Sequence, residues 1–135
     1  NMDRLLKKWE TAKNIVPSPI VYQKKNISEN ALLFFGTTNY AAVEAIDLLE
    51  KESIQVDSLR ILAFPFNNEV LEFIDQHEKV FVIEQNRDAQ MKTLLMKELG
   101  IPQHKLISVL NYNGLPITAD AIKREVSSHL ALKTA

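Results

Sequence analysis

Cysteine is absent from this sequence, and its absence excludes several kinds of chemistry together. Without thiolates the chain has no disulfide, no cysteine-ligated iron–sulfur cluster, no zinc ribbon and no cysteine nucleophile. Any electron carrier of a redox enzyme that contains this polypeptide must therefore lie on another domain or subunit. The histidines His77, His104 and His129 stand too far apart for a helical metal site. We accordingly predict that the chain binds no metal.

The sequence also lacks a strong charge of either sign and a long apolar run. Its formal net charge of -1 gives no electrostatic reason to expect nucleic acid or an anionic membrane surface as a partner. No apolar run approaches the roughly 18–20 residues that a bilayer-spanning helix needs, and the first residues are charged rather than signal-like. We expect a cytoplasmic protein that binds neither nucleic acid nor membrane.

Glycine is scarce, with 3 in the chain, and this scarcity limits phosphate binding. Neither the Gly-x-Gly-x-x-Gly spacing nor a Gly-Lys-Ser/Thr ending is present. The turn Gly36-Thr37-Thr38-Asn39 could still hold an anion through free helix amides and two hydroxyls. A capped turn explains the same residues. Anion binding at Gly36, Thr37 and Thr38 is therefore the alternative hypothesis and not the favoured one.

Residues 1–30 have the pattern of a linker. Apolar residues at spacings of four, three and four predict an amphipathic helix over 3–16, and they are Leu5, Trp9, Ala12 and Val16. Pro17 and Pro19 end this helix and force an extended path. Residues 20–30 have the composition of an irregular polar connector. We interpret 1–30 as a linker that enters the domain from an upstream part.

From residue 31 onward, short apolar runs alternate with helical patterns. Four runs are typical of buried strands, and they cover 31–35, 59–64, 79–83 and 105–110. Helical stripes cover 40–52, a short segment capped by Asn67 or Asn68, a segment from Asp88 to Leu99, and a last one from Thr118 to Leu130. This alternation predicts right-handed crossovers around a mostly parallel sheet. We expect one α/β domain over 31–135 with helices on both faces.

Polar side chains cluster after the third apolar run. Six of the seven positions from Glu84 to Gln90 are polar, which is unusual for a simple turn. No second acid, base or nucleophile stands near Glu84 in the sequence, so we predict no catalytic residue. We interpret the cluster instead as a structural or interface corner, together with the turn that follows the fourth run. The predicted corner residues are Glu84, Gln85, Asn86, Gln90, Tyr112 and Asn113.

Five segments occur in an order that resembles a known family. They are Phe34–Thr38, Glu44–Ile46, Leu62–Phe66, Val82–Asn86 with Gln90, and Ser108–Thr118. Together they resemble the C-terminal domain of the alpha subunit of 2-oxoacid:ferredoxin oxidoreductases, especially the 2-oxoglutarate branch, over about residues 31–130. The chain departs from the family at Ala89, where glycine is usual.

The resemblance implies a particular fold and parent enzyme. The fold would be that of the transketolase C-terminal domain, a three-layer α/β sandwich on a five-stranded sheet with one antiparallel strand. The residues indicate four strands, and we expect the fifth near Ile20–Gln23 or near the C-terminus. The parent enzyme would decarboxylate a 2-oxoacid on thiamine diphosphate, form an acyl-CoA and pass electrons to ferredoxin.

The same resemblance places the cofactors outside this domain. Thiamine diphosphate, magnesium and the iron–sulfur clusters would be bound by other parts of the parent complex, and CoA would be its cosubstrate. This domain would be inactive alone and would serve packing and contacts with other subunits, reaching ferredoxin only through the complex. Two alternatives stay open. One is a free-standing α/β module that binds an anion or nucleotide at Gly36–Asn39, and the other is a transketolase or pyruvate-dehydrogenase relative that does not use ferredoxin.

Overall fold

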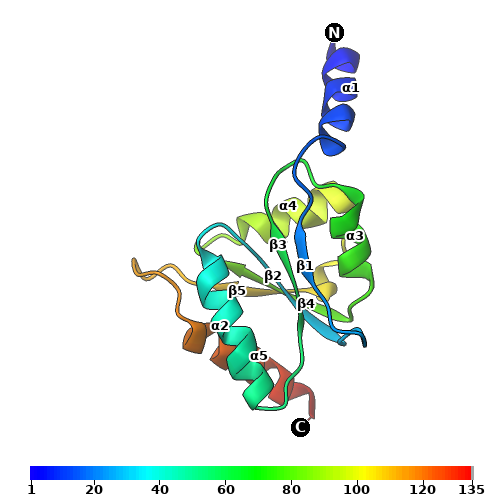
Figure 1. The fold of residues 1–135 in the computed structure, drawn as a ribbon. Helices are drawn as coiled ribbons and strands as arrows, with labels where there is room; N and C mark the ends of the chain where they lie inside the picture. Colours follow the sequence, from blue (N-terminus) through cyan, green and yellow to red (C-terminus); the bar gives the residue numbers. More distant parts are fainter. Residues whose placement is uncertain (135) are drawn as a thin grey trace.

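A five-stranded mixed sheet lies at the centre of the computed structural model, which describes residues 1–134 (Figure 1). The strands are β1 Ile20–Tyr22, β2 Asn30–Phe35, β3 Asp57–Ile61, β4 Lys79–Glu84 and β5 Leu106–Leu110. The helices are α1 Met2–Lys13, α2 Thr38–Lys51, α3 Asn68–Asp75, α4 Gln90–Leu99 and α5 Ala119–Thr134, with a 3-10 turn at Gln103–Lys105. The strand order is β1-β3-β2-β4-β5, and only the edge strand β1 runs antiparallel to its neighbour.

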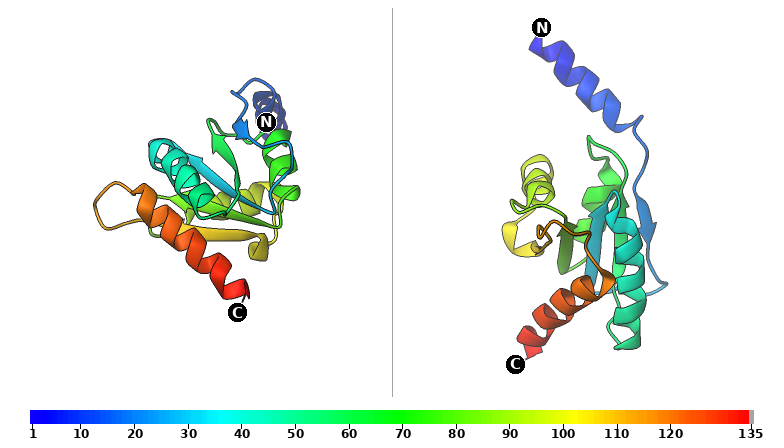
Figure 2. Two further views of the ribbon diagram at one scale, coloured as in Figure 1. Left: turned by 60° about the horizontal axis from the view of Figure 1, so that its bottom comes forward. Right: turned by 90° about the vertical axis from the view of Figure 1, so that its left-hand side faces the viewer.

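Helices cover both faces of the sheet because the central strands are apolar on both sides. On β2, Leu32 and Phe34 belong to the core beneath α2 and α5, whereas Ala31 and Leu33 belong to the core beneath α3 and α4. All four side chains are fully buried. Figure 2 shows the resulting helix–sheet–helix layers. The three-layer α/β fold predicted from the sequence is therefore confirmed.

The fifth strand is β1, which lies in the segment that the sequence pattern indicates as an irregular connector. That interpretation is wrong for residues 20–22, which pair with β3 in the register Val21 opposite Leu59. The strand has only three residues, and two of them are exposed. A strand this short and this exposed leaves no continuous apolar run for sequence analysis to detect.

The third strand is displaced from its predicted bounds of 59–64. β3 begins at Asp57 because Asp57 and Ser58 pair with residues of β2 despite being polar. It ends at Ile61, opposite Phe35, because β2 ends there in a turn at Gly36. Residues beyond Ile61 consequently have no partner strand.

Several helix boundaries and the predicted cap of α3 also differ from the predictions. α1 ends at Lys13 instead of residue 16, and α4 begins at Gln90 instead of Asp88. α3 begins at Asn68 after Asn67, but the Asn67 side chain makes no capping hydrogen bond. Its amide donates instead to the Ser18 hydroxyl, at 3.3 Å.

Helix α1 extends away from the layered body, as Figures 1 and 2 both show. None of its residues is buried. The Trp9 ring contacts Phe64 at a centroid distance of 5.2 Å, and Phe64 contacts the buried Phe66 at 5.1 Å. This row of edge-to-face rings holds the C-terminal part of α1 on the domain. The large apolar side chains nearer its start remain exposed, and they are Met2, Leu5 and Leu6.

A buried ionisable pair ties the edge of the sheet to α3. His77 Nε2 lies 2.9 Å from Asp57 Oδ2, and His77 Nδ1 lies 2.6 Å from the carbonyl oxygen of Phe73. Ser28 donates its backbone N–H to the same Asp57 carboxylate at 2.9 Å. Asp57 and His77 are each 1% exposed. The pair therefore joins β3, the end of α3 and the segment between β1 and β2.

Replacing Asp57 by alanine should lower the free energy of unfolding by about 3–5 kcal/mol, because His77 and the Ser28 amide lose their buried partner. Glu50→Ala is the matched control, since Glu50 pairs with Lys24 on the exposed surface, and it should cost less than about 1 kcal/mol. Urea unfolding measures both variants. Equal losses in the two would contradict a stabilising role for the buried pair.

Candidate functional site

The central strands β2 and β4 meet at the point where the strand order reverses. From β2 the chain continues to β3 on one side of the sheet, while β4 lies on the other side. Open α/β sheets bind ligands beyond the carboxyl ends of the strands at such a point. A cavity of about 490 Å³ lies there. Its lining residues are Phe35, Gly36, Thr37, Thr38, Glu84, Gln85, Asn86, Gln90, Met91 and Leu94.

This cavity brings together most of the residues that the sequence singled out. The predicted anion turn and the predicted polar corner line it from opposite sides. Tyr112 and Asn113 are not among its lining residues. The chemistry of the cavity therefore depends on how the two groups of side chains bond to each other.

Glu84 is fully buried at the end of β4. Its carboxylate accepts the backbone N–H of Met91 at 2.6 Å and that of Lys92 at 3.1 Å. The Asn86 side-chain amide donates to the same carboxylate at 2.9 Å. The first amides of a helix have no intrahelical partner and carry the positive end of the helix dipole. A carboxylate from the preceding strand thus occupies the position at the start of α4 where an external anion could bind.

Gln85 links three loops at the carboxyl edge of the sheet. Its side-chain amide donates to the hydroxyls of Thr38 at 3.0 Å and Thr37 at 3.5 Å. Its carbonyl oxygen accepts the backbone N–H of Ile117 at 3.2 Å. One side chain therefore connects the start of α2, the β4–α4 loop and the segment before α5. The Thr38 hydroxyl, which is buried, already has a partner within the chain.

Asn86 and Gln90 close the β4–α4 loop. The Asn86 side-chain oxygen accepts the backbone N–H of Gln90 at 3.3 Å. Between them Ala89 has φ 50° and ψ 48°, in the left-handed region that glycine adopts without steric cost. Glycine, usual there in the family that the sequence resembles, suits this backbone geometry better than alanine. Helix α4 begins at Gln90 because the left-handed backbone of Ala89 cannot continue a right-handed helix.

Tyr112 and Asn113 lie on a loop beyond β5 that projects from the body of the domain (Figure 1). The Asn113 side-chain oxygen accepts the N–H of Leu115 at 3.0 Å, and the Asn111 side-chain amide donates to the Leu115 carbonyl oxygen at 2.7 Å. The Asn111 N–H donates to the Glu84 carbonyl oxygen at 2.9 Å. These bonds brace the loop, yet Tyr112 is 65% exposed and Leu115 69% exposed.

The cavity between β2 and β4 has no cationic side chain among its lining residues. Arg87, which follows the corner, is exposed and pairs with Asp88 at 2.8 Å. The amides at the start of α2 contribute positive potential, whereas those at the start of α4 are already bonded to the buried Glu84 carboxylate. The cavity therefore offers hydroxyls and amides to a neutral polar group and gives an anion little electrostatic stabilisation.

Metal-binding clusters, bilayer-spanning helices and nucleophile–base pairs are the other arrangements that bear on function. Within 1–134 no three histidine, aspartate or glutamate side chains gather closely enough to hold a metal ion. None of the helices in this range is both long and apolar enough to cross a bilayer. No hydroxyl, imidazole and carboxylate come together at the cavity as a nucleophile and its base would.

Sequence analysis did not identify the backbone partners that define the corner. The amides of Met91, Lys92 and Ile117 carry no signal of their own in a sequence, because every residue has such a group. Leu115 likewise has no signal of its own within the segment Ser108–Thr118. A glutamate that ends a buried strand just before a helix was the one available sign of the Glu84 cap.

Comparisons with known proteins identify the fold through solved structures alone. No family's sequence profile matches the chain, and no curated protein matches it. The chain is similar to 2-oxoglutarate:ferredoxin oxidoreductase from Magnetococcus marinus, solved with 2-oxoglutarate, coenzyme A and succinyl-CoA bound. The TM-score is 0.76 at 21% identity, over 88% of this chain and 21% of that chain.

Two further structures are similar over most of this chain. A split-gene transketolase, described as an inactive beta4 tetramer, gives a TM-score of 0.64 at 20% identity, over 84% of this chain and 42% of that chain. The alpha chain of a probable 2-oxoacid ferredoxin oxidoreductase from Thermoplasma acidophilum gives 0.56 at 23% identity, over 84% of this chain and 97% of that chain.

These similarities confirm the predicted transketolase-like α/β fold. Two of these three similar structures are 2-oxoacid:ferredoxin oxidoreductases, the class whose motifs the sequence resembles. The chain spans about a fifth of the first structure's chain and less than half of the second. Activities, substrates and partners of those whole proteins accordingly do not transfer with the fold.

Changing Glu84 to glutamine should lower the free energy of unfolding by about 2–3 kcal/mol, because hydrogen bonds to a charged group are lost at the start of α4. Glu98→Gln, on the exposed side of the same helix, should stay within about 0.5 kcal/mol of the parent. Urea unfolding followed by circular dichroism measures both. A midpoint for Glu84→Gln that matches the control would show that the carboxylate does not cap the helix.

Changing Ala89 to glycine should raise the free energy of unfolding by up to about 1 kcal/mol, since relief of left-handed strain exceeds the entropy cost of glycine. The reverse change Gly36→Ala is the matched control. Gly36 has φ +60° and no atom within 4 Å of an added Cβ, so strain alone should lower stability by a similar amount. Thermal unfolding measures both, and a stabilising Gly36→Ala would refute the strain argument.

Proposed function

We propose that this chain is the non-catalytic C-terminal domain of the alpha subunit of a thiamine-diphosphate-dependent 2-oxoacid:acceptor oxidoreductase, which uses ferredoxin as its acceptor. The parent enzyme oxidatively decarboxylates a 2-oxoacid to an acyl-CoA, and this domain serves packing and subunit assembly. The observation that carries the proposal is the internally bonded corner. Glu84 and Gln85 satisfy the polar groups at the carboxyl edge, where an α/β enzyme would bind its ligand.

The absence of cofactor binding in this domain is part of the proposal. Thiamine diphosphate with its magnesium ion, the iron–sulfur clusters and CoA belong to other domains or subunits of the parent complex. The chain has no cysteine to ligate a cluster. The M. marinus enzyme to which it is similar is described with 2-oxoglutarate, coenzyme A and succinyl-CoA bound, which supports the same reaction class for the parent.

The braced loop beyond β5 supports the assembly role. Tyr112 and Leu115 present apolar surface, and Asn111 and Asn113, which flank Tyr112, hold the backbone of Leu115. Such a loop loses little conformational entropy on binding, so its contacts contribute efficiently to affinity. Tyrosine in particular is enriched among the residues that dominate protein–protein binding energy. We assign this loop to a contact with another part of the parent complex.

A second candidate function is that of a free-standing module that binds an anion or nucleotide at Gly36, Thr37 and Thr38. The cavity beside the start of α2 favours it, and the lack of a lining cation counts against it. Calorimetric titration of the isolated chain with inorganic phosphate and with a nucleotide separates the two functions. Saturable micromolar binding would favour the module.

The purified chain should decarboxylate no 2-oxoacid.

The double variant Tyr112→Ala with Leu115→Ala should fail to join the other subunits of the parent complex. Because both side chains are exposed, the variant's thermal midpoint should remain that of the parent chain within a few degrees. Leu132→Ala, equally exposed on α5, is the control and should assemble normally.

Reconstitution from separately produced subunits, followed by size-exclusion chromatography, measures this assembly. Turnover of a 2-oxoacid by the isolated chain would overturn the non-catalytic assignment. Normal incorporation of the double variant would remove the loop from the interface.

A further inference from the structure

A groove between β1 and α2 lies on the face of the sheet that α2 and α5 cover. Its volume is about 430 Å³. The hydrophobic cluster on this face includes residues of β2, β4 and β5 and none of β1 or β3, since Ser58 of β3, which pairs with Leu32, is polar. Tyr22 and Val43 line the groove and are 58% and 45% exposed. We call this surface the β1–α2 groove.

The floor of the β1–α2 groove contains an unsatisfied polar atom. Ser58 lines the groove and is 1% exposed, and its hydroxyl has no hydrogen-bond partner. A buried hydroxyl without a partner is destabilising and rare in native proteins. The apolar walls of the groove, Tyr22 and Val43, are exposed and open to a partner.

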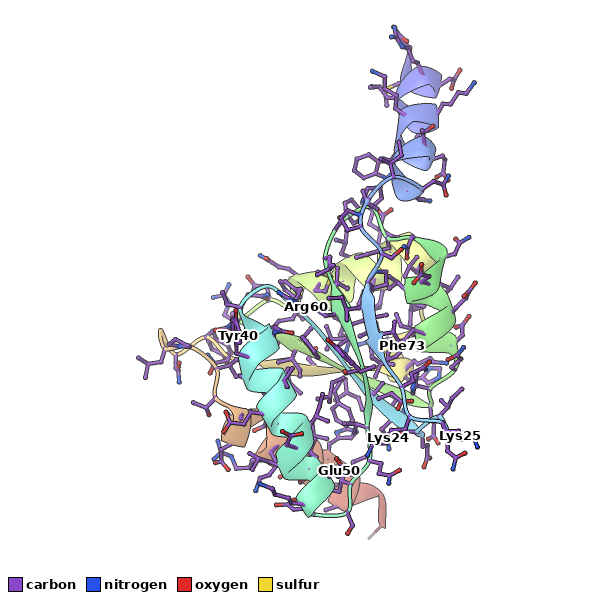
Figure 3. The ribbon with its side chains drawn as sticks, in the orientation of Figure 1. Lys24, Lys25, Tyr40, Glu50, Arg60 and Phe73 are labelled. Carbon is purple, nitrogen blue, oxygen red and sulfur yellow. The ribbon has the colours of Figure 1, made fainter. Side chains whose placement is uncertain are left out.

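The two rims of the groove carry opposite charges. On α2, the exposed Asp47 lines the groove, and the exposed Glu44 lies one turn earlier on the outer surface of the helix, outside the lining. Neither forms an ion pair within the described chain. On the other rim stands Lys24, which follows β1. Lys24 pairs with Glu50 across the far end of the groove, and Figure 3 shows the two residues close together there.

Helix α1 has the matching pattern. Its apolar stripe is exposed, with Met2 70% and Leu5 59% exposed. Arg4 and Lys8, four residues apart, lie along one side of this stripe, and Asp3 and Glu10 lie along the other. Arg4 and Lys8 form no ion pair within the described residues. An apolar stripe with a cationic and an anionic border is complementary to an apolar groove with an acidic and a basic rim.

We propose that α1 of a second copy of this chain docks in the β1–α2 groove. The stripe around Leu5 lies over Val43, and the cationic border of α1 lies along Glu44 and Asp47. The α1 helix of the same chain does not fill this groove, because its Trp9–Phe64 contact holds it away from the groove (Figure 2). This inference rests on the proposed assembly role and names one of the partners.

The contact area of one short helix predicts weak self-association. Interfaces of this size belong to the transient class, with dissociation constants on the order of 1–100 µM. Because charge pairs border the contact, association should weaken as salt increases. Sedimentation equilibrium over this concentration range should therefore show a mass above 15.4 kDa that falls with dilution.

The absence of cysteine allows a direct test by disulfide trapping. One preparation carries Leu5→Cys and the other carries Val43→Cys, and the two are mixed under mild oxidation. Docking in trans should form the mixed disulfide at least tenfold faster than Leu5→Cys mixed with Leu132→Cys, because docking raises the local thiol concentration. Leu132 is 77% exposed on α5, remote from the groove, and provides the matched control.

The variants Leu5→Glu and Val43→Glu should each abolish self-association, while Leu132→Glu should leave it unchanged. All three positions are exposed, so circular dichroism should show the same fold in each. A chain that stays monomeric at 200 µM overturns the proposal. So does a disulfide formed within one dilute Leu5→Cys/Val43→Cys chain, which would place α1 in its own groove.

A third result would assign α1 to a different partner. Binding of the monomer to vesicles of phosphatidylcholine with phosphatidylserine, lost in Leu5→Glu, would mean that the helix contacts a lipid surface, and it too would overturn the proposal. The assays use only the purified chain. If the chain does not self-associate, the assembly role of the Tyr112 loop is unaffected. If reconstitution shows that the Tyr112 loop has no assembly role, self-association of the chain can still be measured.

Discussion

The structure depends on a carboxylate that lies where a ligand could have been. Glu84 ends the central strand β4, is removed from water and receives the first free amides of α4. Burying a carboxylate costs several kcal/mol unless hydrogen bonds and a favourable potential compensate, and the start of a helix supplies both. Once this side chain is in place, Asn86 and the β4–α4 loop are fixed by it, and the Glu84 backbone holds the loop beyond β5.

The corner explains how an α/β sheet can serve as an assembly module. Ligand-binding relatives of this architecture leave amides and hydroxyls open at the carboxyl edge. Here Gln85 engages the hydroxyls of the first turn and the amide before α5. The hydrogen bonds that occupy this edge also fix its loops. In the assembly role that we propose, a fixed edge would present Tyr112 and Leu115 to another protein with little loss of conformational entropy.

Strands with continuous apolar residues could be predicted from the sequence, whereas a short edge strand and a polar strand start could not be recognised from the residue pattern. Continuous apolar runs indicated β2, β4 and β5, since strands buried on both faces need apolar residues at every position. The residue pattern alone did not indicate β1, because three residues at a sheet edge need only backbone pairing with β3. β1 nevertheless lies at the first of the two positions that the family resemblance implied, near Ile20–Gln23. The start of β3 was missed because Asp57 is polar, and its burial depends on His77, twenty residues later.

The polar corner was recognised as a group, but its bonding was not. Six polar residues among the seven positions from Glu84 to Gln90 marked the place, yet the partners of Glu84 and Gln85 include main-chain amides that no pattern distinguishes. Ala89 was noticed as a departure from the resembled family, and its left-handed backbone gives that observation a physical cause. Tyr112 lies outside the cavity because the loop that carries it turns away from the sheet.

The antiparallel edge strand has a consequence for the order in which the chain folds. β2, β3, β4 and β5 are joined by successive crossovers, but β1 pairs with a strand 38 positions later, Val21 with Leu59. β1 has nothing to pair with until β3 has been placed by β2, so it and the attached α1 are the last elements to be ordered. Closing that long loop costs entropy that only a three-residue ladder and a few contacts repay. The same elements are then the first to detach in local unfolding, which makes this edge the part of the domain with the fastest amide exchange.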